Sequence, residues 1–253
     1  MSPSQGTSEI MRSWARYLIF FQYIGTKYSG AVKVPPHQLC KKGVQDHLED
    51  AIRALKPINQ VSLSVSSRTD TGVHALCNSA HFDLQRRNDM PPFSENVFVD
   101  ALNFYLKSEQ IRVNRAHRVP DHFHARYCAQ SRTYVYRIAL RTSHRSLLPL
   151  TESNLCWTLP NAEIPFWELT FTSKSFLYKQ VRRMAGALVG VGQGRLSVPQ
   201  LKEVLEARDS LAFPQALAAP AHGLFLTQVD YKETDLQHSP QTSEESSSGN
   251  SED

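Results

Sequence analysis

The order of apolar and polar positions along the chain predicts an alternation of strands and helices. The first apolar stretch, at 17–24, is rich in aromatic and β-branched residues, which is typical of a strand. Further strands are predicted at 61–65, 76–84, 111–116, 134–139, 166–172 and 224–231. Apolar residues three and four positions apart predict helices at 44–55, 94–106, 176–191 and 198–207. Two rounds of strand, helix and strand with extra hairpins predict an α+β protein with antiparallel or mixed sheets.

The helix predicted at 176–191 has two different sides. One side is an apolar stripe at helical spacing, made of Leu177, Val181, Met184, Leu188 and Val191. Arg182 lies off this stripe, on the side that carries Ala185, Gly186 and Val189. Side chains this small would let another element approach the helix closely.

Composition and charge narrow the class of protein. The 253 residues are 41% hydrophobic and 21% charged, which is ordinary for a globular protein, and no apolar run is long enough to span a bilayer. The net charge is +4, but residues 233–253 hold six acids and no Lys or Arg, so residues 1–232 carry +10. That segment is also rich in Ser and Glu without apolar periodicity, which predicts a disordered tail. The basic body predicts a polyanionic partner.

Basic residues gather in one part of the chain. Eight arginines face a single acid, Asp121, over 112–145: Arg112, Arg115, Arg118, Arg126, Arg132, Arg137, Arg141 and Arg145. Phe123, Tyr127, Tyr134 and Tyr136 are interleaved with them. Guanidinium groups suit phosphates and aromatic rings suit unstacked bases, so this region is a candidate nucleic-acid surface. The alternative is a solvated basic face with no ligand.

The segment at 67–75, Ser-Arg-Thr-Asp-Thr-Gly-Val-His-Ala, is the strongest candidate for chemistry. It follows a predicted strand, and Gly72 permits a tight turn. Asp70 would stand at the strand end beside basic residues, where a carboxylate can act as a nucleophile or a base. In the alternative interpretation, Asp70 only caps backbone N–H groups of an Asx-type turn. We expect His74 to serve the turn through hydrogen bonds.

Five stretches in order resemble the tRNA pseudouridine synthase A (TruA-like) family, and within it the eukaryotic pseudouridine synthase-like 1 branch. In chain order they are Gly-Val-Gln at 43–45, the Asp70 segment at 67–75, His-Ala-Arg at 124–126 with Arg-Thr-Tyr-Val-Tyr at 132–136, Phe-Leu-Tyr-Lys-Gln-Val-Arg at 176–182, and Ala-Pro-Ala-His-Gly-Leu at 219–224. The resemblance implies two α+β subdomains whose sheets, flanked by helices, form a basic central cleft for RNA. It also implies isomerisation of uridine to pseudouridine in tRNA.

The resemblance assigns roles to six residues. Asp70 would be the catalytic nucleophile, and Arg182 would pair with it and hold it ionised and oriented. Tyr134 would stack on the target uracil and relay a proton. Arg68 would help to hold the base out of its stack, and Arg126 and Arg132 would contact RNA. The family uses no cofactor and no metal, and the chain contains no His/Cys spacing typical of a metal site.

The chain departs from the family between the strand ends near 160 and 165, where relatives carry several tens of additional residues. The domains implied are a disordered leader at 1–15, an N-terminal subdomain at 16–118, a shortened C-terminal subdomain at 119–232 and the tail at 233–253. Loss of the extra segment would expose apolar surface and a sheet edge. An alternative function is therefore a non-catalytic RNA-binding protein or an inactive shortened form.

Partners and compartment follow from the same resemblance. The expected partner is tRNA, with other RNA as a second option, and no membrane partner is expected. The family often forms homodimers, so a homodimer is one expected state. The branch and a weakly basic N-terminus favour a mitochondrial location, with a cytoplasmic or nuclear one as the alternative.

Overall fold

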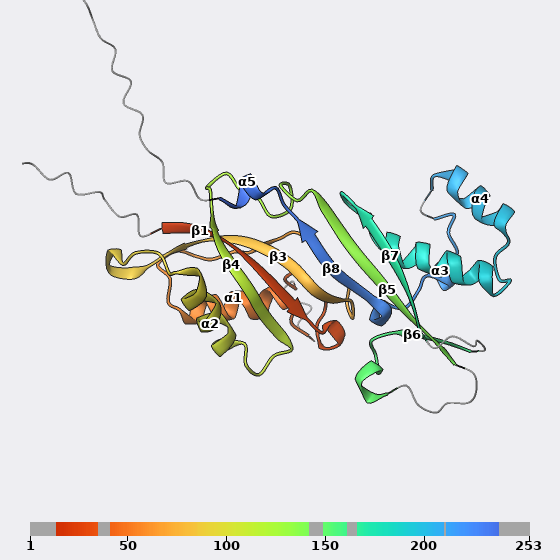
Figure 1. Cartoon of the computed structure of the whole chain (residues 1–253), viewed down its shortest axis with the longest axis horizontal. Coiled ribbons are helices and arrows are strands. Elements are labelled where there is room, and N and C mark those ends of the chain that lie inside the picture. The colour runs from red at the N-terminus through yellow and green to blue at the C-terminus, as the bar shows by residue number, and fades with distance from the viewer. Residues whose placement is uncertain (1–13, 35–40, 142–148, 161–165, 210, 238–253) are drawn as a thin grey trace, which may run out of the picture.

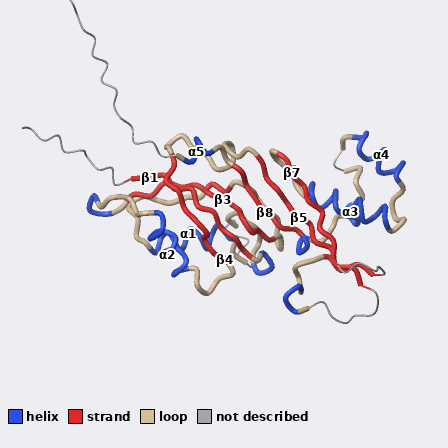
Figure 2. Tube along the Cα trace, viewed as in Figure 1, coloured by secondary structure: helices blue, strands red, loops and turns tan. Residues whose placement is uncertain are grey.

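A computed structural model describes residues 14–34, 41–141, 149–160, 166–209 and 211–237 (Figures 1 and 2). The strands in this part of the chain are β1 (Trp14–Tyr23), β2 (Ser64–Val65), β3 (His74–Gln85), β4 (Ile111–Val119), β5 (Ser131–Arg141), β6 (Trp157–Pro160), β7 (Phe166–Ser173) and β8 (Leu224–Asp230). The α-helices are α1 (Val44–Ala54), α2 (Glu95–Tyr105), α3 (Gln180–Gly192), α4 (Val198–Ala207) and the single turn α5 (Glu233–Leu236). The predicted α+β class is confirmed.

All eight strands described belong to one mixed sheet. Its main order is β4-β1-β3-β8-β5-β6, β2 pairs with β3, and β7 pairs with β5. Most neighbours are antiparallel, but β3 and β8 run parallel where His74 and Ala75 lie opposite Phe225 and Leu226. This short parallel contact joins the strands of the N-terminal half to those of the C-terminal half, so the sheet is continuous in Figure 1.

The core lies on both faces of the N-terminal strands. Along β1, Tyr17, Ile19 and Phe21 point to the main cluster with α1 and α2, whereas Leu18 and Phe20 point to a second cluster on the other face. Both sets are buried, which explains why residues 17–21 of this strand are all apolar instead of alternating with polar ones. A third, smaller cluster holds α3 against α4.

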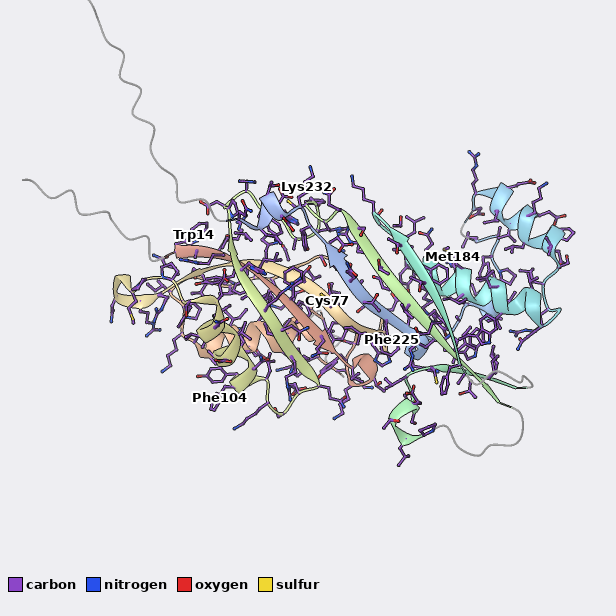
Figure 3. The ribbon with its side chains drawn as sticks, in the orientation of Figure 1. Trp14, Cys77, Phe104, Met184, Phe225 and Lys232 are labelled. Carbon is purple, nitrogen blue, oxygen red and sulfur yellow. The ribbon has the colours of Figure 1, made fainter. Side chains whose placement is uncertain are left out.

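Helix α3 differs from the prediction in its start, but the close approach predicted on its small-residue side is confirmed. It begins at Gln180, four residues later than predicted, and its buried side carries Ala185, Gly186 and Val189. In the apolar stripe, Val181 is buried, whereas Met184, labelled in Figure 3, and Leu188 are 40% and 52% exposed. The small side is buried because the chain near Leu217 packs directly on it, so the neighbour that is present, and not the larger apolar stripe, decides the orientation of the helix.

Apolar side chains are also exposed on the outermost strand of this half. Strand β7 pairs only with β5 among the described strands, and its Phe166 and Trp167 are 43% and 49% exposed. Leu177, between β7 and α3, is 79% exposed. This surface adjoins the place at which the sequence resemblance puts the missing segment. In the described residues, no helix has both the length and the apolar character needed to cross a membrane.

Two predicted boundaries shift. Trp14 and Ala15, placed in the leader by the sequence, already belong to β1, and the predicted tail at 233–253 begins with the helical turn α5. Leu236 of this turn packs against the second cluster. The rest of the leader and tail, and residues 161–165, lie outside the described residues. The division into subdomains near residue 118 stays a prediction.

Candidate active site

The loop between β2 and β3 carries Asp70 and is fixed by buried hydrogen bonds. The side-chain amide of Asn78 donates to the carbonyl oxygen of Ser67 at 3.0 Å. The hydroxyls of Tyr23 and Thr69 lie 2.8 Å apart and share a hydrogen bond. Because these partners come from β3 and β1, the sheet itself sets the place of Asp70. No sequence pattern signalled either bond.

The turn ends on a buried histidine, whose ring bonds to segments other than the turn that the sequence predicted it to serve. Gly72 has φ +80°, a conformation that side chains other than glycine rarely adopt. The backbone N–H of Gly25 donates to Nδ1 of His74 at 3.0 Å, so the ring proton is on Nε2, which faces the carbonyl oxygens of Asn154 (3.1 Å) and His222 (3.2 Å). Burial lowers the pKa of His74, which is consistent with a neutral ring in this role.

Asp70 and Arg182 meet across the two halves of the chain. Arg182 Nη1 donates to Asp70 Oδ2 at 3.1 Å, and the side chains are only 22% (Asp70) and 16% (Arg182) exposed. Arg182 is held in turn by Ala219, because its Nε donates to the Ala219 carbonyl at 2.7 Å while its own carbonyl accepts from the Ala219 N–H at 3.0 Å. Among the described residues, the Asp70 carboxylate makes no hydrogen bond to the turn backbone, so the Asx-turn interpretation is wrong.

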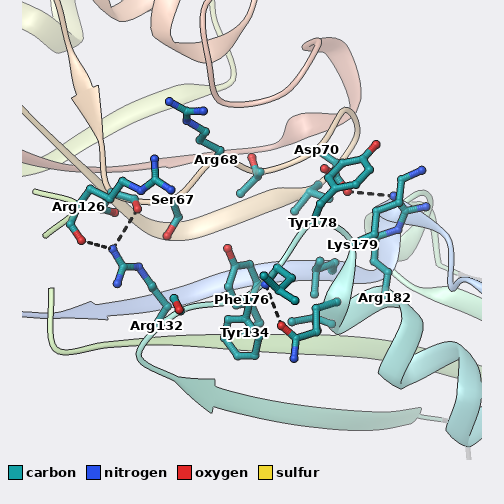
Figure 4. A pocket seen from close by; sticks show the side chains of 18 of the residues that line it. Ser67, Arg68, Asp70, Arg126, Arg132, Tyr134, Phe176, Tyr178, Lys179 and Arg182 are labelled. Atoms are coloured by element: carbon teal, nitrogen blue, oxygen red, sulfur yellow. Dashed lines mark hydrogen bonds and ion pairs between the residues drawn. The ribbon is translucent and has the colours of Figure 1, made fainter. Parts of the chain in front are cut away.

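Tyr134 lies near this ion pair (Figure 4). It is 8% exposed, and its ring meets Phe176 edge to face with centroids 5.3 Å apart. Burial raises the pKa of Tyr134, and the neighbouring Ser67 hydroxyl and the charge of Arg132 partly offset this rise. The phenol is therefore neutral at physiological pH and can donate or accept a hydrogen bond.

Arg132 is buried and hydrogen-bonded to the protein. Its Nη2 donates to the carbonyl oxygens of Ser66 (3.1 Å) and Arg126 (2.7 Å), and its Nη1 donates to the carbonyl of Lys174 (2.6 Å). These carbonyls belong to three separate segments that line one pocket, so Arg132 ties the pocket together. The RNA contact predicted for this residue stays a prediction, with both terminal nitrogens already bound to backbone.

The pocket has a volume of about 720 Å³ and contains Asp70, Tyr134 and Arg182 together (Figure 4). The six predicted site residues all line it. Among the residues that the structure describes, its only acidic lining residue is Asp70, whereas its basic lining residues are Arg68, Arg126, Arg132, Lys174, Lys179 and Arg182. Two exposed tyrosines, Tyr127 and Tyr178, also line it. The sequence analysis missed Lys174, Tyr178 and Lys179, although the 176–182 motif places two of them beside Arg182.

The arginine-rich stretch does not form one basic face. Arg126 and Arg132 reach the pocket, but Arg115 covers the ring of Phe20 at 4.0 Å. Arg137 pairs with Glu152 at 2.9 Å and with Glu168 at 3.3 Å. Charges that are close in sequence therefore serve different parts of the fold, because the strands point successive side chains to opposite faces. Within the described residues, no group of three potential ligands fits a metal ion.

The His-Ala-Arg turn at 124–126 rests on a second buried histidine, which leads to a pH prediction. The N–H of Ala125 donates to Nδ1 of His81 at 3.1 Å. Burial, the neighbouring His124 and Arg16 lower the pKa of His81 from 6.5 to about 4, against smaller opposite effects of Asp83 and the Ser64 backbone. The native state therefore holds His81 neutral, and the unfolded state takes up the proton first as the pH falls. We therefore expect the contribution of neutral His81 to the free energy of unfolding to be fully present above pH 6.5. This contribution should be lost as the pH falls towards 4.

The variant His81→Asn tests this expectation, because Asn Oδ1 replaces the Nδ1 acceptor but does not titrate. Urea unfolding at a series of pH values measures the free energy of unfolding. Between pH 6.5 and 4, this free energy should fall less in His81→Asn than in the wild type, by on the order of 2 kcal/mol. The exposed His122→Asn is the matched control and should leave the decline as it is. An unchanged decline in His81→Asn would show that other groups cause it.

The family model that matches this chain and several relatives similar to it carry the description tRNA pseudouridine synthase. A family model described as tRNA pseudouridine synthase matches residues 19–128 and 134–232. Proteins named tRNA pseudouridine synthase-like 1 from Xenopus laevis and Homo sapiens are 44% and 41% identical to the chain, with 88% and 86% of the chain and 94% and 90% of the relatives covered. A tRNA pseudouridine synthase A from Hyphomonas neptunium is 31% identical over 85% of the chain and 98% of its own length.

The alignments also bear on the length of the chain. The one to the Xenopus laevis protein extends over 281 positions, which is more than the 253 residues of this chain. That relative therefore carries residues with no counterpart here.

Proposed function

The chain belongs to the tRNA pseudouridine synthase family, and we propose that it converts uridine to pseudouridine in tRNA in the pocket around Asp70. The observation that carries this proposal is the Asp70–Arg182 pair, 3.1 Å apart, in a pocket of about 720 Å³ whose other charged lining residues are basic. A carboxylate next to Tyr134 suits a reaction on a base, and the basic walls suit its phosphates.

The reaction rearranges bonds without any net change in composition. The bond from uracil N1 to ribose C1′ breaks, and a bond from uracil C5 to C1′ forms. The hydrogen on C5 is released and N1 gains a proton. We assign the nucleophilic role to the Asp70 carboxylate, which would attack the sugar or the base while the old bond breaks. The same carboxylate, or a neighbouring hydroxyl, would take the C5 proton at the end.

The other residues would hold the participants in place. Arg182 orients the carboxylate through a charge-assisted hydrogen bond and is itself fixed by Ala219. Tyr134 would stack on the detached uracil and keep it in the pocket. The target base must leave its stack to enter, which costs roughly a few kcal/mol. Arg68, which is exposed at the pocket, would fill the gap that the flipped base leaves in the RNA stack. Arg126 would contact the phosphates of the RNA backbone.

Several finer statements remain predictions. Other RNA substrates and a homodimer rest on the family resemblance, and a mitochondrial location rests on the resemblance together with the weakly basic N-terminus. The alternative function, an RNA-binding protein without activity, is not favoured, because the residues to which the family chemistry is assigned lie together in one pocket.

A two-readout experiment tests the proposed function. The chain is mixed with tRNA transcripts made with uridine tritiated at C5, and both bound RNA and released tritium are measured. We expect tritium release at a rate that depends on the enzyme concentration, since C5 loses its hydrogen. Binding without release from folded protein would favour the alternative function.

Salt dependence tests the role assigned to the basic walls. Arg132 and Arg182 are bonded within the protein, so if the other four basic lining residues meet phosphates, affinity for tRNA should fall on the order of 10²-fold between about 50 and 200 mM salt. A titration of labelled tRNA at each salt concentration measures this slope. An affinity that stays flat over the range would contradict phosphate binding by the pocket walls.

A further inference from the structure

The hydroxyl of Ser67 is an unpartnered polar group inside the pocket. Ser67 is 6% exposed and lines the pocket next to Arg68 and near Tyr134 (Figure 4). Its backbone carbonyl is satisfied by Asn78, but its Oγ has no hydrogen-bond partner among the described residues. A buried hydroxyl without a partner is unfavourable, so most native proteins avoid one unless a ligand completes it.

The polar neighbour of Ser67 is the Tyr134 hydroxyl. The two lie close enough for Ser67 to influence the pKa of Tyr134, but they do not reach the distance and angles of a hydrogen bond. Proximity alone does not direct a hydrogen towards an acceptor, so the Ser67 hydroxyl has no partner among the described residues. The Ser67 hydroxyl therefore keeps a donor and an acceptor that a ligand atom beside Tyr134 can satisfy.

The base named by the proposed function offers such atoms. Uracil presents O2, N3–H and O4 in a row, on the edge opposite the carbon and nitrogen that bond to ribose. To be detached from N1 and rejoined through C5, the ring turns about the axis through N3 and C6. This turn exchanges N1 with C5 and O2 with O4, and it leaves N3–H in place. A fixed hydroxyl therefore meets the same chemical group before and after the rotation.

We propose that Ser67 Oγ hydrogen-bonds this imide edge of the flipped uracil and keeps the base oriented while it is detached. This inference rests on the proposed function and deepens it, because it makes Ser67 a substrate-contacting residue. A serine hydroxyl is both donor and acceptor, so it can bond to either the N3–H or a carbonyl oxygen. Tyr134 would hold the same edge from its other side.

The first test is Ser67→Ala, which removes only the hydroxyl. We expect kcat/KM for tritium release from tRNA to fall roughly tenfold, the scale of one lost hydrogen bond. We expect Tm to stay the same or rise, because the lost hydroxyl has no partner within the protein. Ser29→Ala is the matched control, since the Ser29 hydroxyl is also buried and unpartnered but does not line the pocket, and neither quantity should change. Unchanged kcat/KM, or a loss accompanied by a lower Tm, would overturn the proposal.

The second test needs no catalysis. Wild type and Ser67→Ala are titrated with a seven-nucleotide oligouridylate and with an abasic oligonucleotide of the same length. The wild type should prefer the oligouridylate, and Ser67→Ala should lose several-fold of that preference while binding the abasic strand equally well. An equal preference in both proteins would overturn the role of Ser67, whether or not the chain is active. A lost preference together with no tritium release from the wild type would instead reject the proposed function and keep the uracil site.

Discussion

Replacing Asp70 with asparagine should reduce the rate of pseudouridine formation by roughly 10⁴-fold or more, the scale of losing a catalytic nucleophile. Asn has the shape of Asp but lacks the negative charge, so it neither attacks carbon well nor pairs with Arg182. Affinity for tRNA should be kept or slightly increased, because the substitution removes a negative charge from among the basic lining residues of the pocket. Single-turnover tritium release and a binding titration measure the two quantities separately.

Asp100→Asn is the control for this prediction. Asp100 is exposed on α2, outside the pocket, and its substitution by Asn changes the net charge of the protein by the same amount as Asp70→Asn. Its rate and affinity should match those of the wild type within experimental error. A rate for Asp70→Asn within tenfold of the wild type would contradict the assignment of Asp70 as nucleophile.

Replacing Gly186 with alanine should damage both stability and activity. A Cβ at this position would lie 1.9 Å from the carbonyl oxygen of Leu217 and 2.9 Å from the backbone nitrogen of Ala219. Backbone atoms cannot rotate away as a flexible side chain can, so α3 would have to move. We expect a loss of about 3 kcal/mol in the free energy of unfolding, measured by urea denaturation. The movement would also break the two hydrogen bonds between Ala219 and Arg182.

The same helix provides the control. Gly192 ends α3, and a Cβ there would meet no atom within 4 Å. Gly192→Ala should therefore keep the wild-type activity and stability, or gain up to about 1 kcal/mol from helix propensity. If Gly186→Ala were as stable and as active as Gly192→Ala, the close packing of α3 on residues 217–219 would not position Arg182.

The pairing of Asp70 with Arg182 shows how far sequence reasoning reaches. The two residues are 112 positions apart, and neither periodicity nor composition joins them. The family resemblance predicted the pair, and the structure places its atoms at hydrogen-bond distance. Local apolar patterns were sufficient to predict most strands and the helices α1 and α2, because each of these elements buries one or two regular apolar faces.

Two features depend on contacts that local sequence does not show. Periodicity marks the larger apolar stripe of α3, but a helix buries the side against which a neighbour packs, and here the small residues beside Gly186 are buried, as their size predicted. The RNA contact predicted for Arg132 stays a prediction, and the structure bonds its terminal nitrogens to backbone carbonyls. An arginine looks the same in a sequence whether its nitrogens meet phosphates or carbonyl oxygens of its own chain.

Apolar side chains are exposed on β7 and α3, while the pocket residues keep their contacts. Relatives carry residues with no counterpart here, and Trp167 and Leu188 are half exposed on β7 and α3. Nevertheless, Arg182 on the same helix keeps its bonds to Asp70 and Ala219. The shorter chain therefore retains the arrangement to which we assign catalysis, because that arrangement depends on the buried side of α3.

Mapping pseudouridine nucleotide by nucleotide on tRNA transcripts, after incubation with the purified chain, tests the central claim most directly. The account predicts conversion at one or a few defined uridines by the wild type, and none by Asp70→Asn under the same conditions. No conversion by a folded wild-type chain that binds the same tRNA, or equal conversion by both proteins, would contradict it.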